Sequence, residues 1–419
     1  MKTRFADYLL PVAIIITPLA AAIISIYGRP TVVLDAFYNR VWQDDARSGL
    51  IAAAISAGIL AILLVLSTIR IRFEEIKDNY LLSTNIFLTL LFLVGISVLS
   101  NYQAWGVFGI FKLLLFFWIS FVFLRSGLTQ KSFHISSIVV LVSYLLIAIF
   151  PIFSPLNSWK ICRDDKCTIS GSLLTSFFQS ENALSLYVLT TIFFIRFLER
   201  NWQRWSGYLL AFILTYFSGS RLGLAVVVIV VLLLVFNKRF VLVISPLVAM
   251  IVSATLFFLG RGSDITGRGF IFSAVKEIWL ANPIFGVGPN ASQTAFEKGM
   301  VIGFIPYNEQ TEVAHLLAHY GLLVTMVFVG MILILLRSSS TILGDQALFS
   351  LVAPFLIASL AFVTESPASF TIDCPSFWVL SLLFAKVDFA DSAGFEGVDS
   401  FQSANPYKRS PASPSPGTM

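Results

Sequence analysis

The stretch from Arg261 to Glu312 reads RGSDITGRGFIFSAVKEIWLANPIFGVGPNASQTAFEKGMVIGFIPYNEQTE, and it is a long polar interruption in a chain of apolar runs. Within it, apolar residues recur at the spacing of one helical face. This spacing predicts an amphipathic helix that begins near Gly269 and either lies along a membrane or docks on a helical bundle. The predicted apolar face comprises Phe270, Ile271, Ala274, Val275, Ile278 and Trp279.

The run NPIFGVGPN at residues 282–290 is expected to end this helix, because proline and glycine favour turns. A plain connecting loop is the alternative interpretation of the whole stretch. Loops longer than about 15 residues in compact proteins are, however, usually functional or disordered. The aromatic content of this one argues against disorder, so a functional loop is favoured.

The composition excludes a soluble globular chain: 57% of the 419 residues are hydrophobic, only 12% are charged, and the mean hydropathy is +0.86. The expected surroundings are a lipid bilayer. The formal net charge of +5 therefore indicates topology and not a nucleic-acid partner. Lys2 and Arg4 precede the first apolar run, which lacks a small-residue cleavage site and is interpreted as the first span.

The sequence predicts an all-α, polytopic membrane bundle of about 12 transmembrane helices, each built from about 20 apolar residues. The predicted spans are Tyr8–Tyr27, Gly49–Ile69, Tyr80–Leu99, Trp105–Leu124, Ile135–Phe153, Asn182–Phe197, Trp205–Phe217, Leu222–Phe236, Phe240–Leu259, Ala314–Leu336, Ala347–Val363 and Phe377–Val387. The membrane bundle occupies residues 1–387 and carries one large outer loop, residues 261–313. The polar, Ser/Pro-rich residues 388–419 are predicted to form a disordered cytoplasmic tail.

Basic residues orient this bundle, since short cytoplasmic loops carry an excess of lysine and arginine. With Met1 on the cytoplasmic side, each short inner turn is basic and both termini are cytoplasmic. The inner turns hold Arg70, Arg72, Lys77, Arg125, Lys131, Arg196, Arg200, Arg204, Lys238, Arg239 and Arg337. The outer segments hold more cations than sorting alone requires, which favours an anion-binding role for some of them.

Cysteine spacing gives an independent indication of the outer side. Cys162 and Cys167 lie in WKICRDDKCTIS, on an outer loop by this topology. Their spacing can close a small disulfide, which an oxidising compartment favours. Two cysteines alone make a metal site improbable, and Cys374 is left as a free thiol.

Arg221 is the first candidate for chemistry, because it stands at the outer end of a span in the segment FSGSRLG, residues 217–223. An arginine at a membrane edge often only extends to the interface. Arg261 and Arg268 follow in the outer region, however, and guanidinium groups donate bidentate hydrogen bonds to phosphate. The three arginines together suit a phosphate-rich ligand.

His315 and His319 lie one turn apart on one face of the helix that follows the large loop, and Glu312 lies one turn earlier. This spacing can bind zinc, but no third strong ligand is evident, so no metal is predicted. A polar network or an acid/base role is favoured. Lys112, inside a predicted span, either contributes to a lipid-phosphate site or pairs with a carboxylate.

Four segments in order carry a family resemblance: Ser218-Gly219-Ser220-Arg221, Gly267-Arg268, the run NPIFGVGP at residues 282–289, and Gly321-Leu322-Leu323. Over residues Glu181 to Leu336 the chain resembles the O-antigen ligase and polysaccharide polymerase (Wzy-type) family of bacterial inner-membrane proteins. The layout of many spans with one large outer loop agrees with this family.

The resemblance implies cofactor-free, metal-independent glycosyl transfer from an undecaprenyl-diphosphate carrier on the periplasmic side of the bacterial inner membrane. Arg221 and Arg268 would hold the diphosphate, while Glu312 and His315 are candidates for contacting the acceptor hydroxyl. The substrate-binding candidates are Arg261, Lys276, Lys112 and His319. The expected partners are the undecaprenyl-diphosphate-linked oligosaccharide and a chain-length regulator protein.

One departure separates two members of this family. Ligases carry a His-Asn pair shortly before the glycine that matches Gly321, whereas the matching positions here are Gln310 and Thr311. Either the segment is shorter and His315 takes that role, or the ligase base is missing. The difference favours a polymerase that joins lipid-linked repeats over a ligase that transfers polymer to lipid A core. A lipid-linked sugar flippase or transporter is the alternative from another functional class.

Overall fold

The computed structural model describes residues 12, 15–16, 18–20, 22–23, 32–34, 40–42, 81–101, 106–107, 110–111, 114, 118, 127–162, 167–178, 181–236, 248, 251–252, 254–259, 268–288, 312–341 and 386–388. Most of these residues are helical, as predicted. The predicted spans Gly49–Ile69 and Ala347–Val363 and the tail 388–419, apart from Asp388, lie outside them, and the spans beginning at Tyr8, Trp105, Phe240 and Phe377 are described only in part.

Two of the described helical segments are long and apolar enough to cross a membrane, namely Lys131–Phe153 and Val313–Gly330. Shorter apolar helical segments cover Ala183–Phe197 and Gly223–Leu232. By length and composition, the described part of the chain is therefore consistent with association with a membrane.

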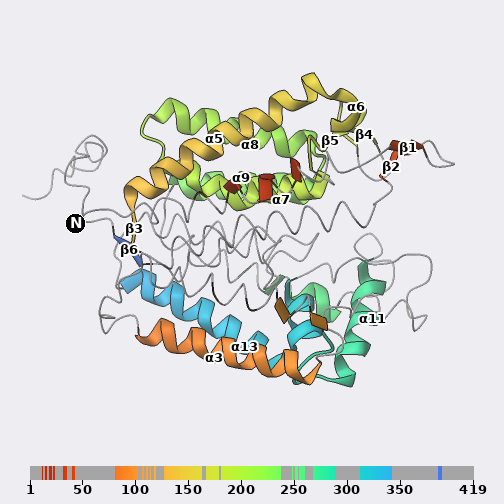
Figure 1. Ribbon diagram of the computed structural model, residues 1–419, viewed down its shortest axis with the longest axis vertical. Helices are drawn as coiled ribbons and strands as arrows, with labels where there is room; N and C mark the ends of the chain where they lie inside the picture. Colours follow the sequence, from red (N-terminus) through yellow and green to blue (C-terminus); the bar gives the residue numbers. More distant parts are fainter. Residues whose placement is uncertain are drawn as a thin grey trace, which may run out of the picture.

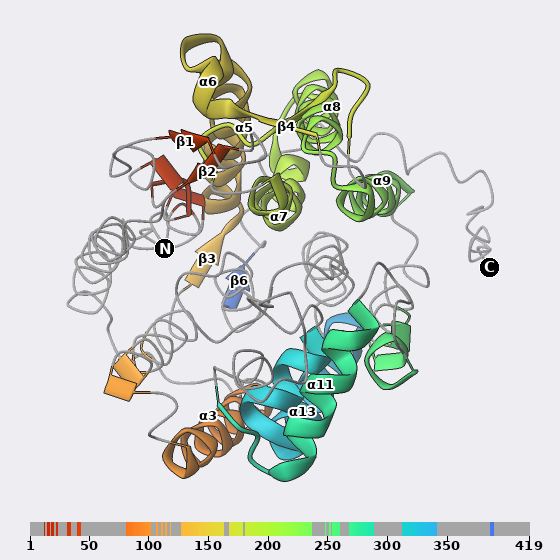
Figure 2. The same ribbon diagram turned by 90° about the vertical axis from the view of Figure 1, so that its right-hand side faces the viewer.

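The helices form two groups that lie on opposite sides of the molecule in both views (Figures 1 and 2). The first group contains α5 (Gln130–Phe153), the short α6 (Pro155–Ser158), α7 (Glu181–Thr191), the 3-10 helix η2 (Ile192–Phe197), α8 (Asn201–Phe217) and α9 (Arg221–Phe236). The second contains α3 (Leu81–Ser100), α11 (Arg268–Ala281) and α13 (Glu312–Thr341).

The sixth predicted span is one segment in sequence but two helices in the structure, since α7 passes into η2 at Ile192. The side chains of Thr190 and Thr191 donate hydrogen bonds back to the carbonyls of Leu186 (3.0 Å) and Tyr187 (2.7 Å). Such back-bonding competes with the helical ladder and bends helices. The change of helix type therefore follows from two adjacent threonines.

The turn between α8 and α9 is as tight as the segment FSGSRLG predicts. Gly219 takes a positive φ of 66°, which a residue without a Cβ adopts without strain. The Ser220 hydroxyl accepts a hydrogen bond from the backbone N–H of Gly223 (3.2 Å) and so caps α9. A Cβ at Gly223 would overlap the hydroxyl of Ser185 on α7, so glycine permits this close helix approach.

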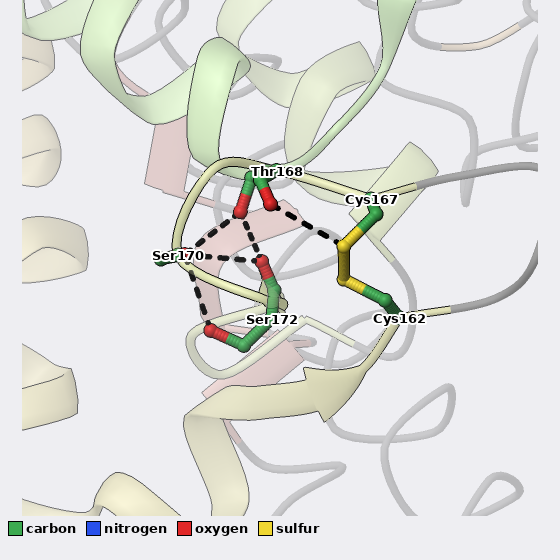
Figure 3. Close-up of a disulfide and its surroundings, with 5 residues drawn as sticks. All are labelled: Cys162, Cys167, Thr168, Ser170 and Ser172. Carbon is green, nitrogen blue, oxygen red and sulfur yellow. Dashed lines mark hydrogen bonds between the residues drawn. A yellow bond between two sulfur atoms is a disulfide. The ribbon is translucent and has the colours of Figure 1, made fainter.

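A small antiparallel hairpin closes one end of the first group. It pairs β4 (Trp159–Ile161) with β5 (Ser172–Leu174), and a disulfide joins Cys162 to Cys167 beyond the end of β4 (Figure 3). The Trp159 ring meets the Phe217 ring at the end of α8 edge-on, with centroids 6.0 Å apart. The hairpin is therefore fixed against the α8–α9 turn.

Lys160 also ties this hairpin to α7. Its ammonium lies 3.8 Å from the carboxylate of Glu181, the first residue of α7, which is 1% exposed. A buried carboxylate is costly unless it is paired, so this contact favours the docked position of the hairpin. The hairpin and α11 both lie on the right-hand side of Figure 1, the hairpin in the upper half of the view and α11 in the lower half.

The other strands were not predicted from the sequence. β1 (Val32–Leu34) pairs antiparallel with β2 (Arg40–Trp42), and β3 (Gly127–Thr129) pairs parallel with β6 (Lys386–Asp388). The β3–β6 pair lies at the end of the molecule opposite α11 (Figure 1). The predicted span Phe377–Val387 is wrong at its C-terminal end, because Lys386 and Val387 belong to β6. Pairing with a distant strand cannot be inferred from a short apolar run.

The disulfide can be tested by thiol counting. Without reductant, denatured protein should take up one maleimide-polyethylene glycol, at Cys374, because Cys162 and Cys167 are joined. After reduction all three cysteines should react. The measurement is the shift of the band in a denaturing gel. The Cys374→Ser variant is the control, and it should show no adduct before reduction and two after it; two adducts before reduction would contradict the disulfide.

Candidate functional site

Helix α11 docks on α13 through its apolar face. Four of the six residues predicted for this face are buried: Ala274, Val275, Ile278 and Trp279. The side chains of Phe270 and Ile271 lie outside the described residues. The predicted helix start near Gly269 agrees with the observed start at Arg268.

The contact between the two helices is a compact apolar core. Phe272, Val275 and Trp279 of α11 pack with Ala314, Leu317 and Ala318 of α13 and with Phe257. Phe272 is fully buried and was missed from the sequence, because it does not fit the pairwise spacing used to assign the face. Of the two placements predicted for this helix, docking on the bundle is the one observed.

A tight turn follows α11 at residues 282–288, as the proline and glycine pattern predicts. The N–H of Gly286 donates to the carbonyl of Asn282 (2.9 Å), and the indole N–H of Trp279 donates to the carbonyl of Pro283 (3.1 Å). Gly286 and Gly288 have positive φ values of 71° and 91°. The turn is therefore anchored to the last turns of α11.

Helix α13 is broken at Gly321, where φ is 83° and ψ is −178°. The prediction of one continuous span, Ala314–Leu336, is corrected here. In this region of backbone space essentially only glycine is stable. The break removes the normal helical partners of nearby carbonyl groups, which must then find other donors.

The turn supplies those donors, and we refer to residues 282–288 together with residues 318–322 as the interlock. Within it, the N–H of Val287 donates to the carbonyl of Ala318 (2.7 Å) and that of Gly288 to the carbonyl of His319 (3.3 Å). In the reverse direction, the N–H of Leu322 donates to the carbonyl of Pro283 (2.9 Å). The two segments therefore complete each other's backbone hydrogen bonding.

Glycine is required on both sides of the interlock. A Cβ at Gly321 would overlap the carbonyl of Ile284, and a Cβ at Gly286 would lie 2.6 Å from the carbonyl carbon of His319. Two backbones approach here more closely than any side chain permits. This close backbone approach therefore explains the glycines in both segments, NPIFGVG and HYG.

Helix α3 holds the interlock from a third direction. The Ser97 hydroxyl donates to the carbonyl of Phe285 (2.6 Å), and the Asn101 side-chain amide donates to the carbonyl of Gly286 (3.1 Å). Ser97 is fully buried. Neither residue was singled out from the sequence, although polar side chains near the end of an apolar run were the available signal.

His315 and His319 lie on one face of α13, just before the break, as their spacing predicts. Both are buried, and their ring centroids are 3.9 Å apart with an angle of 47° between the ring planes. Tyr320 is the next ring, 6.1 Å from each. Imidazole can accept or donate a proton near neutral pH, so this buried pair is a candidate acid/base group.

Two of the predicted arginines share a position, since Arg221 is the first residue of α9 and Arg268 is the first residue of α11. A helix N-terminus carries partial positive charge and free N–H groups, which favour bound anions. Arg221 is exposed, whereas the side chain of Arg268 lies outside the described residues. The hairpin beside the start of α9 lies on the same right-hand side of Figure 1 as α11, but in the other helix group.

The structure describes the other predicted site residues only in part. Glu312 is the first residue of α13, but its side chain lies outside the described residues, as do Arg261 and Lys112 altogether. Lys276 is partly buried on α11, and its ammonium donates to the carbonyl of Phe258 at 3.5 Å. Among the described residues, no group of three or more His, Cys, Asp or Glu side chains could hold a metal ion.

Comparison with known proteins adds no relative to this description. No model of a protein family matches the chain, and no curated protein matches it at a significant level.

The interlock predicts that alanine substitution at two glycines of α13 has different effects on stability. Gly321→Ala should lower stability by about 1–3 kcal/mol through backbone strain alone, with a further loss from overlap with Ile284. Gly330→Ala is the matched control, because a Cβ there meets nothing within 4 Å. In a helix interior that change should be neutral or stabilising. The thermal unfolding midpoint in one detergent measures both, and equal midpoints for the two variants would contradict the interlock.

Proposed function

We propose that the chain is a membrane polysaccharide polymerase of the Wzy type, which joins lipid-linked oligosaccharide repeats into surface polysaccharide or exopolysaccharide. The observation that carries the proposal is the position of the two arginines. Each begins a helix, and the hairpin packed beside the start of α9 and the helix α11 both lie on the right-hand side of Figure 1, in the upper and the lower helix group respectively. The proposed diphosphate site is on this side of the molecule.

The chemistry is a glycosyl transfer. A hydroxyl of the acceptor repeat attacks the anomeric carbon of the donor chain, a new glycosidic bond forms, and the bond from that carbon to the lipid diphosphate breaks. Negative charge develops on the departing undecaprenyl diphosphate. Fixed guanidinium groups and helix N–H groups aimed at that charge stabilise the transition state, because they need no rearrangement during the reaction.

The proton of the acceptor hydroxyl needs a base. His315 and His319 are the described candidates: both are buried, and both lie at the end of α13 held by the interlock. A base works best when its position is fixed relative to the substrate. Glu312, one turn earlier, is the second candidate. Arg261, Lys276 and Lys112 remain proposed contacts for the lipid-linked substrate.

The proposed setting is the bacterial inner membrane, crossed by about 12 helices with both termini in the cytoplasm. The large loop, residues 261–313, and the disulfide hairpin then face the periplasm. Support comes from the position of α11 and the hairpin on the right-hand side of Figure 1, with the β3–β6 pair on the left-hand side. A disulfide in that hairpin also suits an oxidising compartment.

An O-antigen ligase uses the same donor chemistry with lipid A core as the acceptor, and a flippase would move the lipid-linked repeat without bond formation. A strain lacking the protein distinguishes the three. Lipid-linked single repeats accumulate if a polymerase is missing, and intact lipid-linked polymer accumulates if a ligase is missing. Transfer of labelled repeat across liposomes without chain growth would identify a flippase.

The arginines give the direct test. Arg221→Ala and Arg268→Ala should each reduce polymer formation by about 100- to 1,000-fold, the usual cost of removing one preorganised charge-stabilising donor. Arg→Lys at either position should restore little, because lysine lacks the planar pair of donors. Chain length is measured on gels of cell polysaccharide, and lipid-linked repeats by mass spectrometry.

Arg163→Ala, in the loop between the two cysteines, is the control, since it removes the same charge from the same predicted face. It should leave chain length unchanged. Immunoblots of membranes verify that all variants accumulate equally. Normal chain lengths in Arg221→Ala and Arg268→Ala would contradict the proposed polymerase.

A further inference from the structure

The corner where α5, η2 and α8 meet carries a compact set of arginines. Arg196 lies in η2, Arg200 immediately precedes α8, and Arg204 lies in the first turn of α8. We refer to these three residues as the basic corner. It lies close to the start of α5, which directly follows β3, and β3 lies at the end of the molecule opposite α11 (Figure 1).

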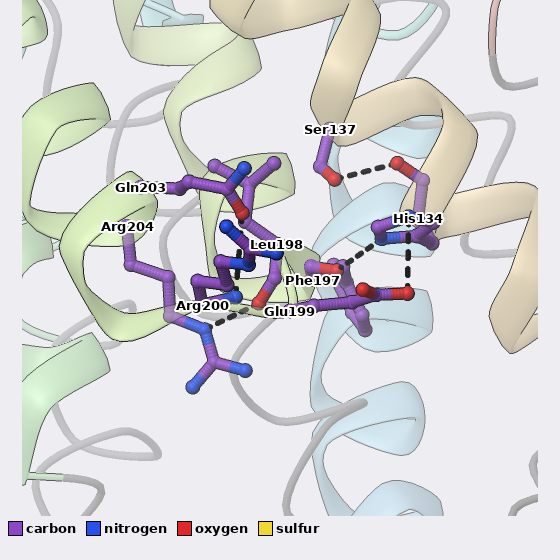
Figure 4. Close-up of polar contacts among 8 residues, drawn as sticks. All are labelled: His134, Ser137, Phe197, Leu198, Glu199, Arg200, Gln203 and Arg204. Atoms are coloured by element: carbon purple, nitrogen blue, oxygen red, sulfur yellow. Dashed lines mark hydrogen bonds and ion pairs between the residues drawn. The ribbon is translucent and has the colours of Figure 1, made fainter. Parts of the chain in front are cut away.

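This corner is rigid, because α5 and the end of η2 are fixed to each other. The rings of Phe133 and Phe197 stack with centroids 4.9 Å apart. The His134 ring also makes two polar contacts, with its Nδ1 3.0 Å from the Phe197 carbonyl and its Nε2 3.5 Å from a Glu199 carboxylate oxygen (Figure 4). The nearby carboxylate of Glu199 is thereby directed towards His134.

Hydrogen bonds at Nε and Nη1 hold the guanidinium of Arg204 in place. Its Nε donates to the Leu198 carbonyl at 2.6 Å, and its Nη1 lies 3.5 Å from the Asn201 side-chain oxygen. Both acceptors are uncharged. In Figure 4 the terminal nitrogens point away from the turn. A planar fork fixed in this way presents its remaining donors for bidentate contact with an anion such as phosphate.

Two cations lie close together at this corner. Burial lowers the pKa of the Arg204 guanidinium, and the charge of Arg196 lowers that pKa further, against a smaller opposite effect of Tyr208. Like charges held near each other repel, and a bound anion relieves that repulsion. The N-terminus of α8, a helix of 17 residues, adds its partial positive charge at the same place.

Two exposed tryptophans flank the arginines. Trp202 is 61% exposed and Trp205 is 57% exposed, and both lie in the first turns of α8. Tryptophan is enriched at the level of lipid headgroups, where its apolar ring and its polar N–H are both accommodated. Their exposure beside a cationic site identifies the phosphate source as a lipid and not a free metabolite.

We propose that the basic corner is a binding site for the phosphate group of an anionic phospholipid, with Trp202 and Trp205 in the headgroup layer beside it. The site requires that the chain sits in a membrane but does not depend on glycosyl transfer. It goes beyond sorting by charge, since it assigns a fixed lipid contact to the guanidinium of Arg204, with Arg196 and Arg200 as further cations of the same corner. Removing the arginines should weaken lipid binding and leave the polymer chemistry at the opposite end in place.

The test uses the full-length protein in a neutral detergent, titrated with brominated phosphatidylglycerol while tryptophan fluorescence is followed. Near a membrane surface each arginine contributes about 1 kcal/mol, so Arg200→Gln should weaken binding about 5-fold and Arg200→Gln with Arg204→Gln about 30-fold. Arg204→Lys keeps the charge but loses the planar pair of donors, so its affinity should lie between those of Arg204→Gln and the unaltered protein. Trp202→Phe with Trp205→Phe should remove most of the quenching.

The control removes two cations from the segment between Cys162 and Cys167, Arg163→Gln with Lys166→Gln, and should leave phosphatidylglycerol binding unchanged. Brominated phosphatidylcholine should bind weakly and equally to all variants. Size-exclusion profiles establish that each variant is folded. The proposal is overturned if the double arginine variant binds phosphatidylglycerol as tightly as the unaltered protein, if the control loses as much affinity, or if inorganic phosphate displaces the lipid at equal concentration.

Discussion

The backbone hydrogen bonds between the turn at residues 282–288 and the broken helix α13 fix the arrangement of the second helix group. Inside a bilayer an unsatisfied N–H or carbonyl group costs several kcal/mol, because no water replaces the lost partner. A helix that breaks at Gly321 would leave such groups, and the turn provides the N–H donors of Val287 and Gly288. Turn and break are therefore stable only together.

This mutual dependence positions two further helices, α11 and α3, and the two histidines of α13. The turn directly follows α11, so the interlock fixes the end of that helix against α13, and the apolar core between them fixes its rotation. Ser97 of α3 and Asn101, the residue directly after α3, donate to the carbonyls of the turn, which adds the third helix. The buried imidazoles of His315 and His319 lie within the two turns before the break, on the fixed part of α13.

Helix positions and the amphipathic face of α11 could be predicted from the sequence, because apolar periodicity is a local property. The tight turn before Arg221 and the turn after Ala281 were also predicted, since glycine and proline restrict the backbone locally. The interlock was not predicted. Gly321 lies in an apolar run in which glycine is common, and its role depends on Ile284, a residue distant in sequence.

The same limit applies to the candidate site. The spacing of His315 and His319 predicts their proximity, and the structure brings the rings together. Ser97 could not be identified in the same way, because its partner, the carbonyl of Phe285, lies 188 residues away. The 3-10 helix η2 was missed for another reason: two threonines compete for carbonyl groups, and this competition leaves the apolar pattern unchanged.

Different contacts therefore position the two helix N-termini that carry Arg221 and Arg268. Arg221 follows a capped turn whose position depends on Ser220, on the contact of Gly223 with Ser185, and on the hairpin packed against the end of α8. Arg268 begins a helix whose far end is fixed by the interlock. Charge stabilisation in a transition state requires donors that are already in place, and donors on rigid elements meet that requirement better than donors on loops. Among the described residues, α11 is positioned by its apolar contact with α13 and by the turn that follows it, to which Ser97 and Asn101 donate hydrogen bonds.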